Sequence, residues 1–235
     1  MEDCRPATNG ELRFAQLLLP SCRIVFDVGA RQDDDLVRLN AGCAFHLFEP
    51  SPKHCRALAE KVKDRSNVTV NPCAFGNARG TAWIYPDTES LVERAHSKSQ
   101  PVPVTLTRLD DYCREHNIRQ IDFLKIDTEG YELEVLKGGR DIVEKGTRVI
   151  QFEYGGTYAD ARITLRMVFD LLGPAWSFYR IYPDHLRPIR GYRPRLEDGR
   201  YANYVASRQP LSPAIVGPGT LQRLFSGARW WRKAS

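Results

Sequence analysis

The stretch Phe123-Leu124-Lys125-Ile126-Asp127-Thr128-Glu129-Gly130-Tyr131-Glu132 decides the fold. Its first half is a short apolar run broken only by Lys125, which is typical of a central strand buried on both faces. Lys125 and Asp127 are two residues apart, so in a strand their side chains lie on the same face. Gly130 and the amphipathic residues after it predict a turn into a helix that ends at Gly138-Gly139. Burying charges costs free energy unless they are paired or face a cleft, so this strand end is a candidate ligand site.

Apolar runs and helical patterns alternate along the rest of the chain. Strands are predicted over residues 23–28, 44–48, 68–70, 81–85, 149–154, 176–182 and 201–206. Helices are predicted over residues 33–39, 52–63, 109–116 and 163–172, after a leading helix in residues 1–20. Strand and helix alternation predicts right-handed parallel crossovers and a doubly wound α/β sheet, and the last two strands suit an antiparallel pair at a sheet edge.

Composition describes an ordinary globular protein of 235 residues, long enough for one large domain and a tail. We find neither a signal peptide nor an apolar run long enough to span a membrane. The six cysteines are scattered, which predicts reduced thiols in a cytoplasmic protein rather than disulfides or a metal site. Four of the +5 net charges lie in the last 25 residues, so the nearly neutral body gives no reason to expect a nucleic-acid partner.

Two kinds of segment are left outside this alternation. We expect one domain over residues 1–209 and a basic, aromatic tail over residues 210–235. In the tail, Thr220 is suited to cap a helix that docks on a membrane surface or a protein, or packs on its own domain. The long polar segments 86–103 and 183–199 are expected to form loops that line an acceptor site.

Three strand ends carry residues suited to an adenosine-containing ligand. Gly29 in Asp27-Val28-Gly29-Ala30-Arg31 follows one strand and precedes a helix, so a ligand can approach the backbone there. Glu49, at the end of the next strand, is placed to accept both ribose hydroxyls, although a solvated strand end is the alternative. Ala74 and Phe75 follow the third strand and are suited to wall an adenine, or to belong to the core.

Six motifs in order resemble one family. They are Asp27-Val28-Gly29-Ala30, Phe48-Glu49-Pro50, Asn71-Pro72-Cys73-Ala74-Phe75-Gly76, Thr105-Leu106-Thr107-Arg108-Leu109-Asp110-Asp111-Tyr112, the opening stretch, and Gln151-Phe152-Glu153-Tyr154. Together they resemble the FkbM family of S-adenosylmethionine-dependent methyltransferases over about residues 23–207. The most specific part is the Lys-Ile-Asp-x-Glu-Gly-Tyr-Glu run that begins at Lys125.

The resemblance implies a Rossmann-like class I methyltransferase fold with a seven-stranded, mostly parallel sheet, helices on both faces and an antiparallel last strand pair. It also implies S-adenosylmethionine as methyl donor and O-methylation of a hydroxyl on a saccharide or secondary metabolite. The residues expected to bind the donor are Asp27, Gly29, Ala30, Arg31, Glu49, Pro50, Ala74 and Phe75. The chain departs from the family at Arg31 and Asp33, where an Asn and a second Gly are usual. We expect Arg31 to pair with the donor's carboxylate, and Asp33 to cap the next helix or attract the donor's cationic groups.

Methyl transfer to a hydroxyl needs alignment of donor and acceptor and a base for the hydroxyl proton. Asp127 is our first choice for the base, and Glu129 and Glu153, at nearby turns and strand ends, are second choices. Lys125 is expected to compensate these acids or hold the acceptor. A structural ion-pair network of the same four residues is the alternative. The carboxylates also permit a divalent metal, but nothing in their spacing requires one.

Two rival functions fit parts of the same pattern. A nicotinamide-dependent oxidoreductase would use Glu49 in the same way, but the usual three-glycine loop is absent. A non-catalytic protein that binds the donor weakly, or acts as a scaffold through residues 220–233, fits the departure at Asp33. Donor binding without turnover would distinguish this rival from the methyltransferase.

Overall fold

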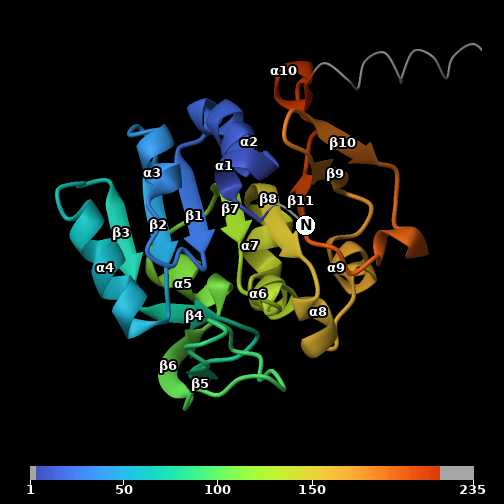
Figure 1. Ribbon diagram of the computed structural model, residues 1–235. Coiled ribbons are helices and arrows are strands. Elements are labelled where there is room, and N and C mark those ends of the chain that lie inside the picture. The colour runs from blue at the N-terminus through green and yellow to red at the C-terminus, as the bar shows by residue number, and fades with distance from the viewer. Residues whose placement is uncertain (1–3, 218–235) are drawn as a thin grey trace, which may run out of the picture.

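In the computed structural model of the protein, which describes residues 4–217, an eight-stranded sheet has the order β10-β9-β11-β8-β7-β1-β2-β3 (Figure 1). Five adjacent strands run parallel: β3 (Val68–Asn71), β2 (Ala44–Phe48), β1 (Ile24–Val28), β7 (Ile121–Ile126) and β8 (Thr147–Tyr154). Antiparallel pairing then continues through β11 (Ala202–Ser207), β9 (Ser177–Ile181) and β10 (Leu186–Ile189). This is a Rossmann-like, mostly parallel α/β sheet with antiparallel strands at one edge, as predicted.

Helices cover both faces of this sheet and bury two separate hydrophobic clusters. One cluster includes residues of α2 (Glu11–Leu18), α3 (Asp35–Leu39), α4 (Pro52–Val62) and α10 (Pro213–Val216). The other includes residues of α5 (Leu109–Glu115), α6 (Glu132–Gly138), α7 (Arg140–Lys145) and α9 (Leu165–Leu172). The shorter helices are α1 (Pro6–Asn9), α8 (Thr157–Asp160), η1 (Leu19–Ser21) and η2 (Pro194–Leu196).

The predicted count of seven strands in the sheet is wrong, because β10 adds an eighth. This strand lies inside the segment 183–199, which we expected to be a loop, and it contains Pro188. Proline lacks an N–H and is tolerated in sheets mainly at edge strands, and β10 is the edge strand here. The arginines and proline of β10 are therefore the reason that the sequence did not predict this strand.

A second sheet has the order β4-β6-β5 and lies beyond the carboxyl ends of β1 and β2 (Figure 1). It consists of β4 (Cys73–Phe75), β5 (Gly80–Ile84) and β6 (Val102–Thr107). The strand predicted over 81–85 is β5, and it belongs to this sheet rather than to the main one. The small sheet therefore forms a wall opposite the ends of the parallel strands.

One face of the main sheet changes from apolar to polar toward the carboxyl ends of its strands. An apolar row in register consists of Val25, Phe123 and Val149. Two residues further along, a polar row consists of Asp27, Lys125 and Gln151. Phe14 of α2 packs on Phe123 with ring centroids 5.8 Å apart. Glu11, three residues earlier, lies on the same side of α2 and faces the polar row.

The two ends of the described chain both pack on the sheet. The leading helix is divided at Gly10, which has φ +103° and whose added Cβ would lie 2.2 Å from the carbonyl oxygen of Tyr182. Near the C-terminus, the Leu211 N–H donates to the Tyr179 hydroxyl and Val216 is buried. The helix predicted after Thr220, with its docking role, lies outside the described residues. Within 4–217 no helix is both long and apolar enough to cross a membrane.

Candidate active site

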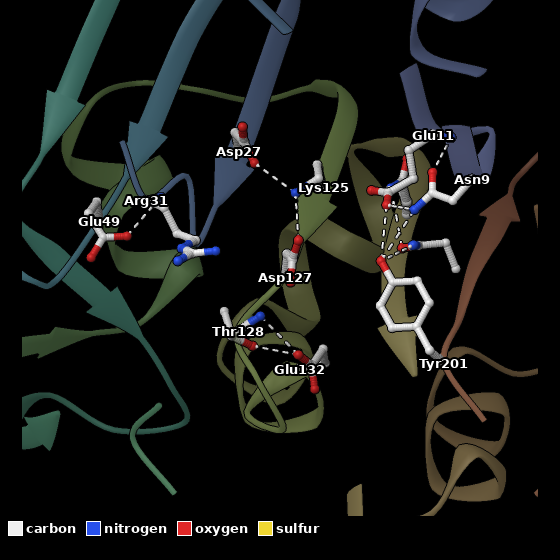
Figure 2. Close-up of polar contacts among 12 residues, drawn as sticks. Asn9, Glu11, Asp27, Arg31, Glu49, Lys125, Asp127, Thr128, Glu132 and Tyr201 are labelled. Atoms are coloured by element: carbon white, nitrogen blue, oxygen red, sulfur yellow. Dashed lines mark hydrogen bonds and ion pairs between the residues drawn. The ribbon is translucent and has the colours of Figure 1, made fainter. Parts of the chain in front are cut away.

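A cavity of about 460 Å³ lies at the carboxyl ends of the parallel strands, bounded by the main sheet, the small sheet and the N-terminal helices. All twelve residues predicted for the site line this one cavity: Asp27, Gly29, Ala30, Arg31, Glu49, Pro50, Ala74, Phe75, Lys125, Asp127, Glu129 and Glu153. Figure 2 shows Lys125 between the carboxylates of Asp27 and Asp127. The structure thus brings the predicted residues together, and their roles stay predictions.

The turn after β1 requires a glycine. Gly29 has φ +87°, and an added Cβ would lie 1.8 Å from the carbonyl oxygen of Asp127, so no side chain fits. Arg31 also has a positive φ, +52°, and its N–H donates to Glu49 Oε2 at 2.8 Å. The Ser51 N–H donates to Glu49 Oε1 at 2.7 Å, so both carboxylate oxygens are oriented by backbone. Burial raises the pKa of Glu49 to about 7.

Lys125 is the positive centre of the cavity. Its Nζ lies 2.9 Å from Asp127 Oδ2 and 3.6 Å from Asp27 Oδ1. Burial disfavours the ammonium charge, but the two carboxylates hold the pKa of Lys125 well above its ordinary value. Burial raises the pKa of Asp27, whose Oδ1 has no hydrogen-bond partner among the described residues. Asp27 therefore offers a buried acceptor at the cavity wall.

Asp127 and Glu153 form a pair of buried carboxyl groups. Burial opposes the charge of Asp127, but Lys125 and a hydrogen bond with Glu153 hold the pKa of Asp127 below its ordinary value. Burial and the charge of Asp127 raise the pKa of Glu153 far above its ordinary range. Two such close carboxyl groups share one proton, because both cannot ionise cheaply. The pair therefore lies directly beside the lysine with one proton between its two carboxyl groups.

Glu132 has a structural role that the sequence analysis missed. Its Oε1 accepts from Thr128 N at 2.9 Å, Thr128 Oγ1 at 3.0 Å and Gly130 N at 3.2 Å. The residue is fully buried, and burial raises the pKa of Glu132 to about 7. Glu132 therefore organises the turn that follows β7. The signal was a glutamate three residues after Glu129, in a turn whose backbone N–H groups need acceptors.

The segment between β5 and β6, residues 85–101, crosses the mouth of the cavity, and we call it the strap. On the side of the β1 turn, Glu89 pairs with the Arg31 guanidinium at 2.5 Å. On the side of the β7 turn, Ser90 Oγ donates to the Glu129 carbonyl at 2.9 Å, and Arg94 pairs with the Glu129 carboxylate at 2.9 Å. Arg31, expected to meet the donor's carboxylate, is thus paired with the strap. Glu89 and Leu91 line the cavity, and their contact with a substrate stays a prediction.

A polar network from distant parts of the chain completes the cavity, and sequence analysis did not find it (Figure 2). Glu11 accepts from Asn9 Nδ2 at 2.6 Å, from Gln151 Nε2 at 2.7 Å and from the Tyr201 hydroxyl at 3.1 Å. Asn203 Nδ2 in turn donates to the Tyr201 hydroxyl at 2.9 Å. Burial raises the pKa of Glu11. Of this network, only Gln151 could have been predicted from the sequence to lie at the site, because it is two residues before Glu153 on the same face of β8.

Apolar residues form the wall opposite this network. Phe75 is buried and packs on Phe48 with ring centroids 4.5 Å apart, so it serves the core as well as the cavity. Ala74 is also buried. Asp33 lines the cavity but does not cap α3, whose N-cap residue is Asp34. In the described part of the chain, no cluster of three or more His, Cys, Asp or Glu side chains is arranged to hold a metal.

Comparison with known protein families identifies the family of this chain. The model of the methyltransferase FkbM domain matches residues 27–178. The chain belongs to the FkbM methyltransferase family. This methyltransferase is 24% identical over 183 residues to the 2-O-methyltransferase NoeI of Sinorhizobium fredii, covering 68% of the chain and 74% of NoeI. It is 26% identical over 148 residues to the hexuronic acid methyltransferase AglP of Haloferax volcanii, covering 60% of the chain and 62% of AglP.

A solved structure of methyltransferase FkbM from Methylobacillus flagellatus is also similar, with a TM-score of 0.46 and 19% identity. The match covers 78% of this methyltransferase and 43% of that chain, so the present chain spans less than half of it. All twelve predicted site residues lie inside the matched range 27–178, whereas Glu11 and Tyr201 lie outside it. The two ends of the methyltransferase therefore add their own wall to the cavity.

Proposed function

We propose that this methyltransferase uses S-adenosylmethionine to O-methylate a hydroxyl of a saccharide or a related small molecule. One observation carries the proposal: the Gly29 turn with Glu49, and the carboxyl pair Asp127 and Glu153, open into one cavity. The first is suited to a nucleoside and the second to proton removal. The names of NoeI and AglP, a 2-O-methyltransferase and a hexuronic acid methyltransferase, support a saccharide acceptor.

The cavity fits the donor in size, shape and charge. Its volume of about 460 Å³ lies within the usual range of small-molecule sites, roughly 300–1,000 Å³. Glu49 ends β2, where a carboxylate accepts ribose hydroxyls in nucleotide-binding folds, and Phe75 with Ala74 offers an apolar surface for an adenine. Gly29 leaves the backbone open to close approach.

The charge of the lining favours a cationic donor over a dinucleotide. Nine acidic residues line the cavity and only Arg31 and Lys125 oppose them among arginines and lysines: Glu11, Asp27, Asp33, Asp35, Glu49, Glu89, Asp127, Glu129 and Glu153. Such a field attracts a sulfonium and an ammonium, and it repels the diphosphate of a nicotinamide dinucleotide. The lining charge therefore supports the methyl donor over the nicotinamide dinucleotide of the oxidoreductase alternative.

When bound, S-adenosylmethionine supplies an electrophilic methyl group on a sulfonium. The protein's share is to align the acceptor hydroxyl, worth roughly 7–11 kcal/mol, and to accept its proton, worth about 10²–10⁴-fold. Asp127 accepts the proton, and Lys125 at 2.9 Å keeps its carboxylate ionised and oriented. Glu153 holds the pair's other proton and donates it in a hydrogen bond to Asp127, which also keeps Asp127 ionised. Glu129, paired with Arg94, is left to hold the strap.

Titration calorimetry with S-adenosylmethionine, S-adenosylhomocysteine and NAD tests the donor assignment. We expect micromolar binding of the two adenosyl ligands and none of NAD. Binding of the donor with no transfer to any member of a panel of neutral sugars, uronic acids and glycosides would instead favour the non-catalytic alternative.

Single-turnover kinetics of Asp127→Asn tests the base. We expect methyl transfer to slow by about 10²-fold or more, with donor affinity roughly unchanged. Glu129→Gln is the matched control, since it removes a neighbouring carboxylate that has a structural partner, and its rate should fall less than tenfold. A near-normal rate for Asp127→Asn would remove Asp127 from the mechanism.

A further inference from the structure

A second hollow, of about 430 Å³, lies where the β9–β10 hairpin meets the segment 190–196. We call it the arginine groove, because five arginines and no acidic residue line it: Arg180, Arg187, Arg190, Arg193 and Arg195. The last four are exposed. Within the described chain, only Arg180 has a carboxylate in ion-pair range, Asp198 Oδ2 at 3.8 Å. The active-site cavity and the groove therefore carry opposite charge.

The acidic residues near the groove have other partners. Glu197 accepts from the N–H groups of Leu165 and Arg166 at the start of α9. Asp184 is bonded to His185 at 2.7 Å. Clustering like charges without counter-charges costs free energy, which a bound anion would offset. From this imbalance we propose that the arginine groove binds a diphosphate group carried by the methyl acceptor, an inference that rests on the proposed function.

The geometry of the groove favours a diphosphate over a single carboxylate. Arg180 is held in place over the rings of Tyr182 and Tyr204, at 5.7 and 5.9 Å from their centroids. Arg187 Nη1 donates to the Tyr182 hydroxyl at 3.3 Å, which orients a second guanidinium on the same side. Each guanidinium is a planar fork that matches two anionic oxygens. Several forks around one hollow need an anion with several oxygens and more than one charge.

The groove and the active-site cavity are near neighbours. Leu196 lines the groove and Tyr201 lines the cavity, so five residues of chain separate their Cα atoms by at most about 18 Å. On the other side, Tyr182 lines the groove, and its carbonyl packs against Gly10, the residue before Glu11. One sugar linked to a diphosphate can therefore reach both hollows. The acidic cavity repels the phosphate end, so the charges also fix which end enters.

Direct binding of inorganic pyrophosphate tests the groove without methyl transfer. We expect the double variant Arg190→Gln/Arg195→Gln to bind pyrophosphate about tenfold or more weakly than the unmodified protein. Added salt should weaken the binding further. The matched control is Arg65→Gln/Arg140→Gln, which removes two exposed arginines outside the groove and should leave the affinity unchanged. No pyrophosphate binding by the unmodified protein, or equal losses in both variants, would overturn the proposal.

Further ligands identify the carrier of the diphosphate. UDP-glucose represents a nucleotide-linked sugar and farnesyl diphosphate a lipid-linked one, and tighter binding of either than of pyrophosphate supports the proposal and names the source. If both bind more weakly than pyrophosphate, the groove does not serve the acceptor. Groove-dependent binding of a short RNA, tighter than that of all three, would overturn it in favour of nucleic acid. Donor affinity, measured in parallel, reports separately on the proposed function.

Discussion

Two turns at the ends of adjacent strands, β1 and β7, are built alike. Each contains a glycine with positive φ, Gly29 at +87° and Gly130 at +101°. Each also holds a non-glycine residue in the left-handed region, Arg31 at +52° and Glu129 at +55°. In each, a buried glutamate accepts from the turn's backbone, Glu49 from the Arg31 N–H and Glu132 from the N–H groups of Thr128 and Gly130. In each, the strap binds the left-handed residue. The same construction thus appears twice around one cavity.

The two glutamates differ in what is left for a ligand. Glu49 comes from the end of β2, lines the cavity and receives one backbone N–H on each oxygen. Glu132 lies within its own turn, is fully buried and receives three donors on one oxygen. A carboxylate oxygen has two lone pairs, so Glu49 keeps acceptor capacity that faces the cavity. A buried glutamate in a motif therefore marks a ligand contact only where it borders the cavity.

The largest contrast between the turns lies in their glycines. A Cβ on Gly29 would lie 1.8 Å from the Asp127 carbonyl oxygen, and one on Gly130 would lie 2.9 Å from the Thr157 carbonyl oxygen. We expect Gly29→Ala to lower the free energy of unfolding by about 4 kcal/mol or to prevent folding, and Gly130→Ala to lower it by about 2 kcal/mol. Urea denaturation measures both. Equal losses would show that the Gly29 turn can shift away from β7.

The two glutamates should separate stability from binding. Glu132→Ala leaves three donors without an acceptor, so we expect a loss of about 3 kcal/mol in unfolding free energy with donor affinity unchanged. Glu49→Ala should weaken donor binding about tenfold or more, with a stability change near 1 kcal/mol, because water replaces the carboxylate at the cavity wall. Thermal unfolding and calorimetry together check the pair, and reversed effects would contradict the comparison.

The raised pKa of Glu132 makes the free energy of unfolding depend on pH. The pKa of Glu132 is about 7 in the folded protein against an ordinary value of 4.5, so the folded state binds more protons between these values. Stability from this group is therefore full below about pH 4.5 and lost as pH rises through 7, by up to about 3 kcal/mol. Glu132→Gln keeps an acceptor without the charge. Its unfolding free energy should exceed that of the unmodified protein at pH 8, and fall short of or match it at pH 5.

The smallest effects concern the two ion pairs that join the strap to the turns. Arg94 is largely buried and also contacts the Glu129 carbonyl, whereas Arg31 is mostly exposed in its pair with Glu89. We expect Arg94→Gln to lower stability by about 1 kcal/mol, and Glu89→Gln to change it by about 0.5 kcal/mol or less. Denaturant titration of both variants measures the difference. A larger loss for Glu89→Gln would mean that the strap is held mainly at the Arg31 turn.

The parallel half of the fold was predictable because its signals are local. The strands β1, β2 and β7 are apolar runs that each end at a polar turn, and the same ends carry Asp27, Glu49 and Asp127. Since parallel strands present these ends at one edge of the sheet, the site follows from the order of the elements.

The remaining parts depend on contacts that no local pattern records. Glu11 accepts a hydrogen bond from Gln151, which is 140 positions away in the sequence. The sequence around Glu11 alone predicts an ordinary surface residue at the start of a helix. The edge strand β10 is obscured by Pro188 and its arginines. The helix α7 follows Gly139 directly, where the glycine pair predicted an end rather than a new beginning. Each of these was decided by tertiary packing.

The position of Glu11 has a practical consequence for anyone who handles this protein. The first helices contribute a carboxylate to the cavity and anchor it to β8 and Tyr201. If the chain were shortened to begin at residue 27, where the match to the FkbM domain begins, one side of the cavity would open to water. Affinity tags and fusion partners therefore need a spacer ahead of Pro6, and a truncated enzyme should be judged by its acceptor affinity as well as its folding.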